Sequence, residues 1–246
     1  MLIAPGSSLG GARPKASIVD DNNHLWIAKF PSINDSIDVG GWEMVTHELA
    51  VKSGINTSYS IVQKFSGNQY TFLTKRFDRT NGNGRIHFAS AMTLLGFKDG
   101  DDYNQGISYL DIVAFILQHG DKSYVNHDLE ELWKRIVFSI CVKNTDDHLR
   151  NHGFVLGEYG WRLSPAYDIN PVPTGTGLTL NISDNDNSLD LNLALDVADF
   201  FRVENSKAKE IISGIEKTIS NWRKIAKQYG LSRNEQEIMS QAFNPK

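Results

Sequence analysis

The sequence contains a single cysteine, Cys141, among its 246 residues. One cysteine cannot form an internal disulfide, and it cannot supply a cysteine-rich zinc site. Because Cys141 lies in an apolar run with helical spacing, we interpret it as a small core residue rather than a reactive thiol.

Long hydrophobic runs are also missing. No stretch approaches the roughly 20 apolar residues that a membrane-spanning helix needs. The first residues, MLIAPGSS, have neither the basic region nor the long apolar region of a signal peptide. We therefore predict a cytoplasmic protein with no membrane partner.

Positive charge is not in excess. The 25 Lys and Arg residues face 29 Asp and Glu residues, which gives a formal net charge of -4. Binding to nucleic acid normally needs a basic face, so we predict no direct nucleic-acid binding, although a local basic pocket for phosphate is compatible with this charge. Two phosphate-binding motifs are absent, the G-x-x-x-x-G-K-[ST] loop and a G-x-G-x-x-G turn that opens a helix.

Residues 1–80 show patterns typical of strands. ASIVD and HLWIAKF flank a D-N-N turn and predict one hairpin, and YSIVQKF and QYTFLTKRF around S-G-N predict a second. A helix is predicted from about Trp42 to Lys52, with Gly54 just past its end. We therefore expect a small β-rich lobe with one helix.

Residues 81–246 are dominated by helical spacing. Helices are predicted in SYLDIVAFILQHG, capped by Ser108, in DLEELWKRIVFSICV, capped by Asp128, and in one long segment near 206–229. GFVLGEYGWRLS predicts two short strands. The predicted fold class is therefore α+β, with a small lobe (1–80) and a larger, mainly helical lobe (81–246). Ligands tend to bind where two such lobes meet.

Five elements with the chemistry of phosphate binding occur in order along the chain. They are a glycine-rich loop (6–15), Lys29 in a predicted strand, Glu43 near the start of a helix, the segment N-T-D-D-H-L-R-N-H (144–152), and Asp168 after a predicted hairpin. Each element alone is a weak signal, since most glycine-rich loops are turns and most strand lysines are solvated. Their common order is a much more specific indication.

Phosphoryl transfer uses all five elements. Glycine amides can approach phosphate oxygens, and a lysine held by a glutamate neutralises the phosphate chain. Asp146 would accept the proton of the attacking hydroxyl, while Asn151 and Asp168 would hold Mg²⁺ through their oxygen atoms. The sequence thus predicts an enzyme that uses ATP and Mg²⁺.

His148 and His152 lie four residues apart and raise the alternative of a zinc site. The segment has no third ligand at a zinc-like spacing, and its Asn and Asp side chains suit Mg²⁺ better. We therefore interpret His148 as a residue that orients Asp146 or Asn151, or that approaches a phosphate.

Several motifs together resemble one family, the HipA-like serine/threonine kinases, which are the toxins of bacterial type II toxin–antitoxin systems. These motifs are S-S-L-G-G-A-R-P-K, L-W-I-A-K-F-P, K-R-F-D-R, N-T-D-D-H-L-R-N-H and L-S-P-A-Y-D-I-N-P. The resemblance extends from about Gly6 to Pro171. It implies a two-lobed protein-kinase-like fold and transfer of phosphate from ATP to Ser or Thr of a protein target.

The resemblance also implies roles for individual residues. Asp146 is similar to the catalytic base of the family, and Asn151 and Asp168 are similar to its metal ligands. Ser8 matches a loop serine that these kinases autophosphorylate, and its phosphate would add up to about two negative charges that repel ATP. The residues implied to bind nucleotide are Gly10, Gly11, Ala12, Arg13, Pro14, Lys15, Lys29, Glu43, Lys75, Arg76, Phe77, His148, Leu149, Arg150, Asn151, Tyr167 and Asp168.

Protein partners follow from the same resemblance. Family members phosphorylate a translation factor, typically an aminoacyl-tRNA synthetase, and a small helix-turn-helix antitoxin of HipB type usually binds them. Members also carry about a hundred residues of N-terminal subdomain before the glycine-rich loop, which implies here a shortened product or a separate small protein that supplies the subdomain. Lys75 stands where the family often has glutamate, and because contact there is expected through the backbone, we expect ATP binding to tolerate it.

The residues leave two other functions open. One is a catalytically impaired kinase-like module that binds nucleotide or the antitoxin and needs a separate N-terminal subunit. The other is a small-molecule kinase, since such enzymes share the two-lobe plan and the D-x-x-x-x-N spacing. Binding without turnover would indicate the first, and a screen of small hydroxyl or amine acceptors would identify the second.

Overall fold

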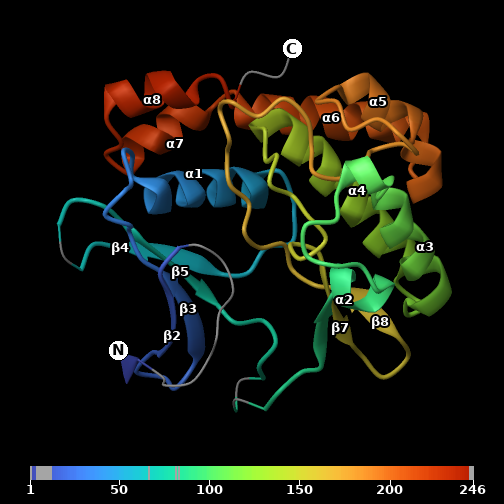
Figure 1. Cartoon of the computed structure of the whole chain (residues 1–246), viewed down its shortest axis with the longest axis horizontal. Coiled ribbons are helices and arrows are strands. Elements are labelled where there is room, and N and C mark those ends of the chain that lie inside the picture. The colour runs from blue at the N-terminus through green and yellow to red at the C-terminus, as the bar shows by residue number, and fades with distance from the viewer. Residues whose placement is uncertain (1, 4–12, 66, 81, 83, 244–246) are drawn as a thin grey trace.

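The structure is a computed structural model that describes residues 2–3, 13–65, 67–80, 82 and 84–243. The predictions for Ser8, Gly10, Gly11 and Ala12 lie outside these residues. Within the described part, one sheet lies below a central helix in the left half of the view, and the other helices lie above that helix and in the right half (Figure 1).

The first sheet has five antiparallel strands. In spatial order they are β1 (Leu2–Ile3), β2 (Lys15–Val19), β3 (Leu25–Lys29), β5 (Thr71–Lys75) and β4 (Ser60–Gln63). Both predicted hairpins are confirmed as β2–β3 and β4–β5, and pairing of β3 with β5 joins them. The β2–β3 turn closes because the Asp20 carboxylate accepts hydrogen bonds from the amides of Asn22 and His24.

Helix α1 (Val39–Lys52) packs against β4 and β5 (Figure 1). It begins before the predicted start at Trp42, because the Asp38 carboxylate accepts a hydrogen bond of 2.9 Å from the Gly41 amide. The same carboxylate accepts the Tyr70 amide at 3.0 Å, so the cap also ties α1 to the strand that follows Tyr70. At the other end Gly54 has φ = 75°, as predicted for a residue just past a helix.

The second sheet is smaller and lies next to helices of the C-terminal part. Its strands are β6 (Phe88–Ser90), β7 (Gly153–Leu156) and β8 (Trp161–Leu163), of which the sequence predicted the β7–β8 hairpin but not β6. The neighbouring helices are α2 (Ala91–Leu95), η1 (Tyr103–Gln105), α3 (Tyr109–His119) and α4 (Val125–Val142). Ser108 caps α3 as predicted, since its hydroxyl accepts the Leu110 amide and the Asp111 carboxylate accepts the Ser108 amide.

The predicted cap of α4 is wrong. The helix begins at Val125, so Asp128 lies within its first turn. There the Asp128 carboxylate accepts hydrogen bonds from the Arg162 side chain at 2.9 Å and from the Leu163 amide at 3.0 Å. Asp128 therefore fastens α4 to β8. The helix ends at Val142, and the next residue, Lys143, turns the chain into the polar segment 144–152 with a φ of 48°.

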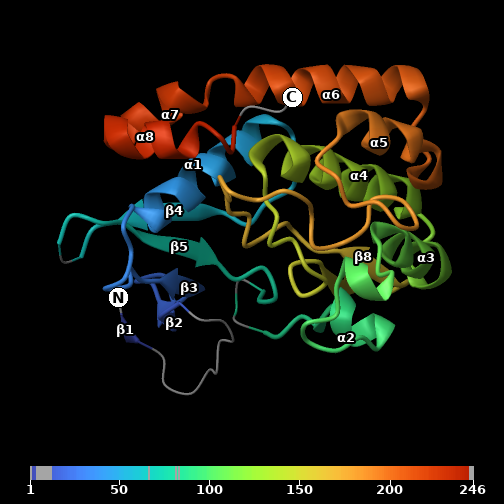
Figure 2. The same cartoon turned by 45° about the horizontal axis from the view of Figure 1, so that its top comes forward.

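The prediction of one long helix near 206–229 is also wrong. Helix α6 (Asn205–Ile219) stops, and α7 (Trp222–Gln228) continues in another direction (Figure 2). The side chains of Ser220 and Asn221 both donate hydrogen bonds to the Lys217 carbonyl, at 2.7 and 2.9 Å. Such side-chain bonds compete with the backbone bonds that would continue the helix.

The break between α6 and α7 places an aromatic group on α1. Trp222 lies 5.9 Å from Trp42 of α1 and stacks on Phe243 at 4.9 Å between ring centroids. These rings belong to one buried cluster that also contains Trp133 of α4. Three further elements, α5 (Leu191–Asp196), η2 (Ala198–Phe201) and α8 (Arg233–Met239), were not predicted. Helix α1 is thus held between the five-stranded sheet and the pair α7–α8 (Figure 2).

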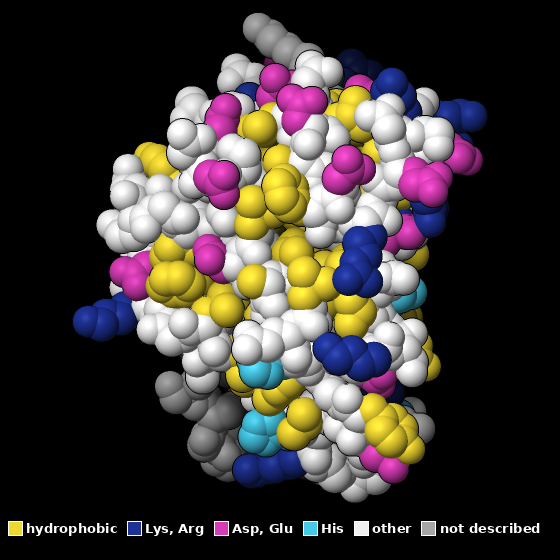
Figure 3. Space-filling view, turned by 90° about the vertical axis from the view of Figure 1, so that its right-hand side faces the viewer, with side chains coloured by type: hydrophobic (Ala, Val, Ile, Leu, Met, Phe, Trp, Pro, Cys, Tyr) yellow, Lys and Arg dark blue, Asp and Glu magenta, His cyan; other side chains and the backbone are white. Residues whose placement is uncertain are grey.

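The surface on the side that carries α3 and α5 mixes hydrophobic and charged side chains (Figure 3). Acidic side chains gather toward the top of this view, and hydrophobic side chains form an irregular band through its middle. Apolar groups scattered among charges are ordinary for a protein surface. Among the residues that the structure describes, no helix combines the length and the apolar character needed to cross a membrane.

Two helical glycines offer a matched test of how closely α1 approaches the sheet. A Cβ added to Gly40 would lie 2.3 Å from the Tyr70 carbonyl oxygen, whereas one added to Gly214 of α6 would meet nothing within 4 Å. Gly40→Ala is expected to lower the free energy of unfolding by about 1–3 kcal/mol, and Gly214→Ala to raise it by about 0.5–1 kcal/mol. Urea denaturation measures both changes. An unaltered midpoint for Gly40→Ala would contradict the close approach.

Candidate functional site

A cleft of about 960 Å³ lies between the five-stranded sheet and the helical part. This volume is within the usual range for a small-molecule site. Most predicted site residues in the described part of the chain line it, namely Arg13, Lys15, Lys29, Glu43, Lys75, Arg76, Phe77, Asp146, His148, Arg150, Asn151, Tyr167 and Asp168.

Two predicted residues are placed differently. Pro14 is not part of the lining, and its carbonyl accepts the Phe30 amide at 2.9 Å. Leu149 packs its side chain in the hydrophobic core at 3% exposure and is not part of the lining, so a contact of this residue with nucleotide stays a prediction. The Leu149 side chain anchors the loop in the hydrophobic core, while its neighbours His148 and Arg150 line the cleft.

A buried lysine is the centre of the cleft. Lys29, the last residue of β3, is 8% exposed. Its ammonium donates a hydrogen bond to the Glu43 carboxylate of α1 and another, of 2.5 Å, to Asp168 Oδ1. Burial alone would lower the pKa of Lys29, but the charges of Glu43 and Asp168 raise it above its ordinary value. The side chain is therefore a fixed positive charge, suited to phosphate.

Asp168 occupies an unusual backbone conformation, with φ = 58°. Strain of this kind in a residue other than glycine is frequent at functional sites. Burial would raise the pKa of the Asp168 carboxyl, but the Lys29 ammonium outweighs burial and lowers the pKa to about 2. The side-chain nitrogen of Asn170, Nδ2, also donates to Asp168 Oδ1 at 3.0 Å, a contact that the sequence did not predict. Asp168 is thus ionised and oriented from two sides.

The loop after α4 separates two adjacent carboxylates. The Asp146 side chain is 79% exposed at the cleft, whereas that of Asp147 is buried. The Tyr109 hydroxyl donates to Asp147 at 2.6 Å, and His152 Nε2 lies 3.1 Å from the other carboxylate oxygen. Burial raises the pKa of Tyr109 well above its ordinary value, and the negative charge of Asp147 raises it further. The phenol therefore stays protonated and remains a donor. Asp147 anchors the loop from behind and leaves Asp146 free to meet a substrate.

Asn151 lies near the other end of the same loop. Its side-chain nitrogen donates to the Asp146 carbonyl at 2.9 Å, which makes the amide oxygen the atom that can bind a cation. Asn151 and Asp168 therefore offer oxygen ligands of the kind that Mg²⁺ prefers. Among the described residues, no group of three His, Cys, Asp or Glu side chains could hold a metal. His152 is buried against Asp147 while His148 lines the cleft, so the two histidines form no zinc-binding pair.

Aromatic rings close one end of the cleft. Phe77 lies 5.7 Å from Tyr167 and 5.4 Å from Phe88 between ring centroids. The Tyr167 hydroxyl donates to the Arg150 carbonyl at 2.6 Å. A Cβ on Gly153 would lie 2.2 Å from the Phe88 ring, so this glycine permits the cluster. The arrangement forms an apolar end wall with a fixed polar edge.

Several basic residues of the lining lie next to carboxylates. The Arg13 guanidinium lies 2.5 Å from the Asp35 carboxylate, and Lys15 Nζ lies 4.0 Å from Asp168 Oδ2. Arg76 donates two hydrogen bonds to Asp78, at 2.8 and 2.6 Å. The described lining holds six Lys and Arg side chains and four Asp and Glu side chains, an excess of positive charge although the protein as a whole is acidic.

The sequence missed several residues of the lining. They are Ile27, Ile37, Val39, Trp42, His47, Ser58, Ser60, Phe72, Thr74, Asp78, Phe88, Ala166, Ile169, Asn170, Pro171, Val172, Pro173 and Met239. The strand period gave a partial signal, since Ser60 and Thr74 are paired directly across β4 and β5. That period shows which residues share a face, but not which face borders a cleft.

The described geometry can be compared with known proteins. The model of the HipA-like C-terminal domain matches residues 7–223. A Haemophilus influenzae protein named "Putative kinase" is 26% identical over 189 residues, which make up 68% of this chain and 54% of that protein. The chain therefore spans about half the length of this curated relative.

Two solved structures share the fold. A chain of the Shewanella oneidensis complex of HipA, HipB and operator DNA has a TM-score of 0.72 at 18% identity, covering 97% of this chain and 64% of that chain. The Helicobacter pylori proinflammatory kinase CtkA has a TM-score of 0.59 at 16% identity, covering 92% of this chain and 95% of that chain. The predicted α+β, kinase-like fold class is confirmed. With nearly the whole chain matched by one family model, this protein belongs to the HipA-like C-terminal domain family.

Proposed function

We propose that the chain is an ATP- and Mg²⁺-dependent protein kinase that phosphorylates Ser or Thr. The observation that carries this proposal is the buried Lys29 ammonium, held by Glu43 and Asp168 beside the exposed Asp146 carboxylate in a single cleft. A fixed cation, an oxygen-rich metal site and an exposed base are the parts that phosphoryl transfer requires.

The reaction balances with the residues present. The acceptor hydroxyl oxygen attacks the γ-phosphorus of ATP, the bond between that phosphorus and the bridging oxygen breaks, and ADP leaves. The hydroxyl proton passes to the Asp146 carboxylate, which is exposed to the cleft. Lys29 binds the phosphate chain, and Asn151 and Asp168 would hold Mg²⁺, which when bound neutralises phosphate charge.

The nucleotide base would sit at the aromatic end of the cleft. The Lys75 amide donates to the Tyr59 carbonyl and the Arg76 amide donates to the Leu25 carbonyl. A base would therefore meet the next amide along the chain, that of Phe77, with the ring of Tyr167 nearby. Because this recognition uses the backbone, the lysine at position 75 is compatible with it.

The finer parts of the function are proposals of the same kind. An aminoacyl-tRNA synthetase is the proposed target, and Ser8 the proposed site of autophosphorylation. A HipB-type antitoxin is the proposed partner, because a neighbour in fold was solved together with HipB and operator DNA. The division into lobes at residues 80 and 81 and the cytoplasmic location also stay predictions.

Replacing Asp146 by Asn tests the proposed base. The variant removes the proton acceptor while Asp147 still anchors the loop, so phosphoryl transfer should fall by about 10²–10⁴-fold. Intact-mass spectrometry after incubation with Mg²⁺ and ATP counts the phosphates gained by each protein. Asp21→Asn, in the exposed β2–β3 turn, is the control and should behave as the parent.

Undiminished transfer by Asp146→Asn would contradict the proposed mechanism. Absence of transfer in the parent, together with thermal stabilisation by ATP, would instead support a nucleotide-binding module. A parent that modifies small hydroxyl or amine compounds but no protein would indicate a small-molecule kinase. Ser8→Ala adds a test of the modification site, since the phosphate gained by the parent should be lost.

Asp168→Asn tests the proposed metal site without depending on turnover. In the parent, Mg²⁺ added to the ATP-bound protein should raise stability by about 2.7 kcal/mol at a hundredfold excess over Kd. The variant weakens one of the two oxygen ligands, so most of this Mg²⁺-dependent increment should vanish. Differential scanning fluorimetry measures the increment, with the exposed Asp184→Asn as control. An increment of equal size in Asp168→Asn would place the metal elsewhere.

A further inference from the structure

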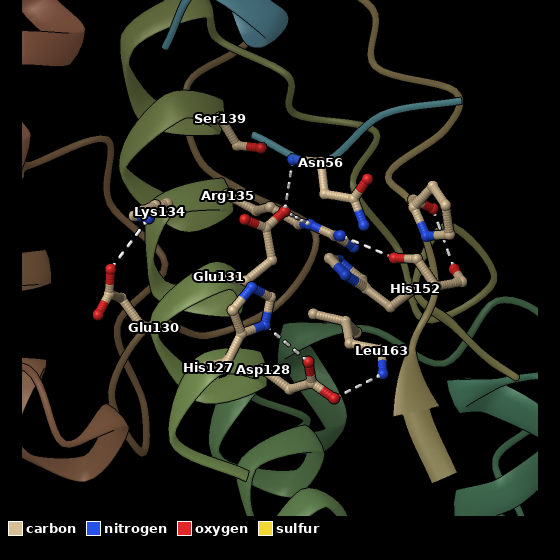
Figure 4. A network of polar contacts seen from close by, with 12 residues as sticks. Asn56, His127, Asp128, Glu130, Glu131, Lys134, Arg135, Ser139, His152 and Leu163 are labelled. Atoms are coloured by element: carbon tan, nitrogen blue, oxygen red, sulfur yellow. Dashed lines mark hydrogen bonds and ion pairs between the residues drawn. The ribbon is translucent and has the colours of Figure 1, made fainter. Parts of the chain in front are cut away.

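Helix α4 carries a buried ion pair that lies outside the cleft. Glu131 and Arg135 are 5% and 4% exposed, one turn apart on the helix. Arg135 Nε donates a hydrogen bond of 3.0 Å to Glu131 Oε1 (Figure 4). Burying two charges costs free energy that a single contact seldom recovers, so the other contacts of the pair decide what it does.

Each member of the pair holds a backbone group from a different part of the chain. Glu131 Oε1 accepts the Asn56 amide at 3.0 Å, in the segment between α1 and β4. Arg135 Nη2 donates to the Ser164 carbonyl at 2.7 Å, just after β8. The ion pair thus connects two loops that are distant in the sequence.

The two loops also bind each other directly. The Ala166 amide donates to the Asn56 carbonyl at 2.7 Å, and Thr57 forms a parallel bridge with Ala166. Together with the Glu131–Arg135 pair, these bonds close a ring. Asn56 is held at both its amide and its carbonyl, and the stretch from Ser164 to Ala166 is held at both ends.

The ring joins the two chain segments that carry the carboxylates bound to Lys29. Asn56 follows α1, the helix that carries Glu43, and Ala166 comes two residues before Asp168. A shift of one loop relative to the other would displace Asp168 relative to helix α1, whose Glu43 binds the same ammonium. A displacement of about 1 Å can cost a hundredfold in rate.

We propose that Glu131 and Arg135 are positioning residues that set the relative placement of Glu43 and Asp168. The expected effect on the rate rests on the proposed kinase function. The expected effect on the two loops rests on the hydrogen-bonded ring alone. Neither residue lines the cleft, so they act through Asn56 and Ser164 rather than by touching substrate.

The same helix supplies a matched control. Asp128 is also buried and charged, but its carboxylate binds Arg162 and the Leu163 amide on β8. Within the described part of the chain, it forms no hydrogen bond or ion pair with the loop after α1. Loss of the Asp128 interaction should destabilise the protein without disturbing Asn56. Comparison of the two sites separates positioning from general stability.

The test replaces the pair as a unit. In the double variant Glu131→Met with Arg135→Met no buried charge is left unpaired, a change that is often tolerated by the fold. Amide hydrogen exchange is followed at Asn56, Ala166 and Leu163, and kcat and KM for ATP are measured well below the unfolding temperature. The control is Asp128→Asn.

The expected result is site-specific. In the double variant, exchange at Asn56 and Ala166 should accelerate at least tenfold, exchange at Leu163 should stay unchanged, and kcat should fall at least tenfold with a smaller change in KM. Asp128→Asn should accelerate exchange at Leu163 alone and leave kcat within about twofold of the parent. Unchanged kcat in a folded double variant, or an equal loss of kcat in both variants, would overturn the proposal.

A second variant keeps the test decisive if the double variant fails to fold. Arg135→Lys retains the charge beside Glu131 but cannot also reach the Ser164 carbonyl, so exchange at Ala166 should accelerate while Asn56 stays protected. Equal protection at both amides would contradict the proposal. If the parent transfers no phosphate, the proposed function fails, and the exchange pattern alone still confirms or refutes the ring as the device that joins the two loops.

Discussion

The buried ammonium of Lys29 is the interaction on which the site depends. A charge removed from water needs opposite charges at close range, and here two carboxylates supply them. They come from α1 and from the loop after β8, so the contact with Asp168 joins residues 139 positions apart. The pair of contacts exists only when sheet, helix and loop are all in place. The site therefore depends on the packing of all three elements.

The surroundings of α1 explain how Glu43 stays in place. The helix is capped by Asp38, and the Asp38 amide donates to Glu235 of α8 at 2.7 Å. Along its length, Trp42 packs on Trp222 of α7 while the opposite side meets β4 and β5. The helix is thus contacted at its cap by α8, on one side by α7 and on the other by β4 and β5. These contacts restrict its rotation. A fixed helix holds Glu43 at the Lys29 ammonium.

The parts of the fold that the sequence predicted are those with local causes. Both hairpins, the Ser108 cap and the helix end at Gly54 follow from residues close in sequence. The failures have distant causes: Asp128 binds β8 instead of capping α4, and the chain breaks after α6 so that an aromatic ring reaches α1. In the site, the motifs predicted thirteen of the residues that line the cleft, but no local pattern reveals that an ion pair on α4 holds Asn56.

Adjacent Asp146 and Asp147 show why motif and geometry are both needed. Identical side chains one residue apart face opposite ways, because the loop after Lys143 turns one carboxylate toward Tyr109 and the other toward the cleft. The Asp147 carboxylate is buried and accepts the Tyr109 hydroxyl, whereas the Asp146 carboxylate is exposed at the cleft. The Asn151 amide fixes the backbone between them through the Asp146 carbonyl. Which of the two carboxylates faces the cleft thus depends on groups outside the cleft, such as Tyr109. The position of Lys29 likewise depends on the elements that hold Glu43 and Asp168.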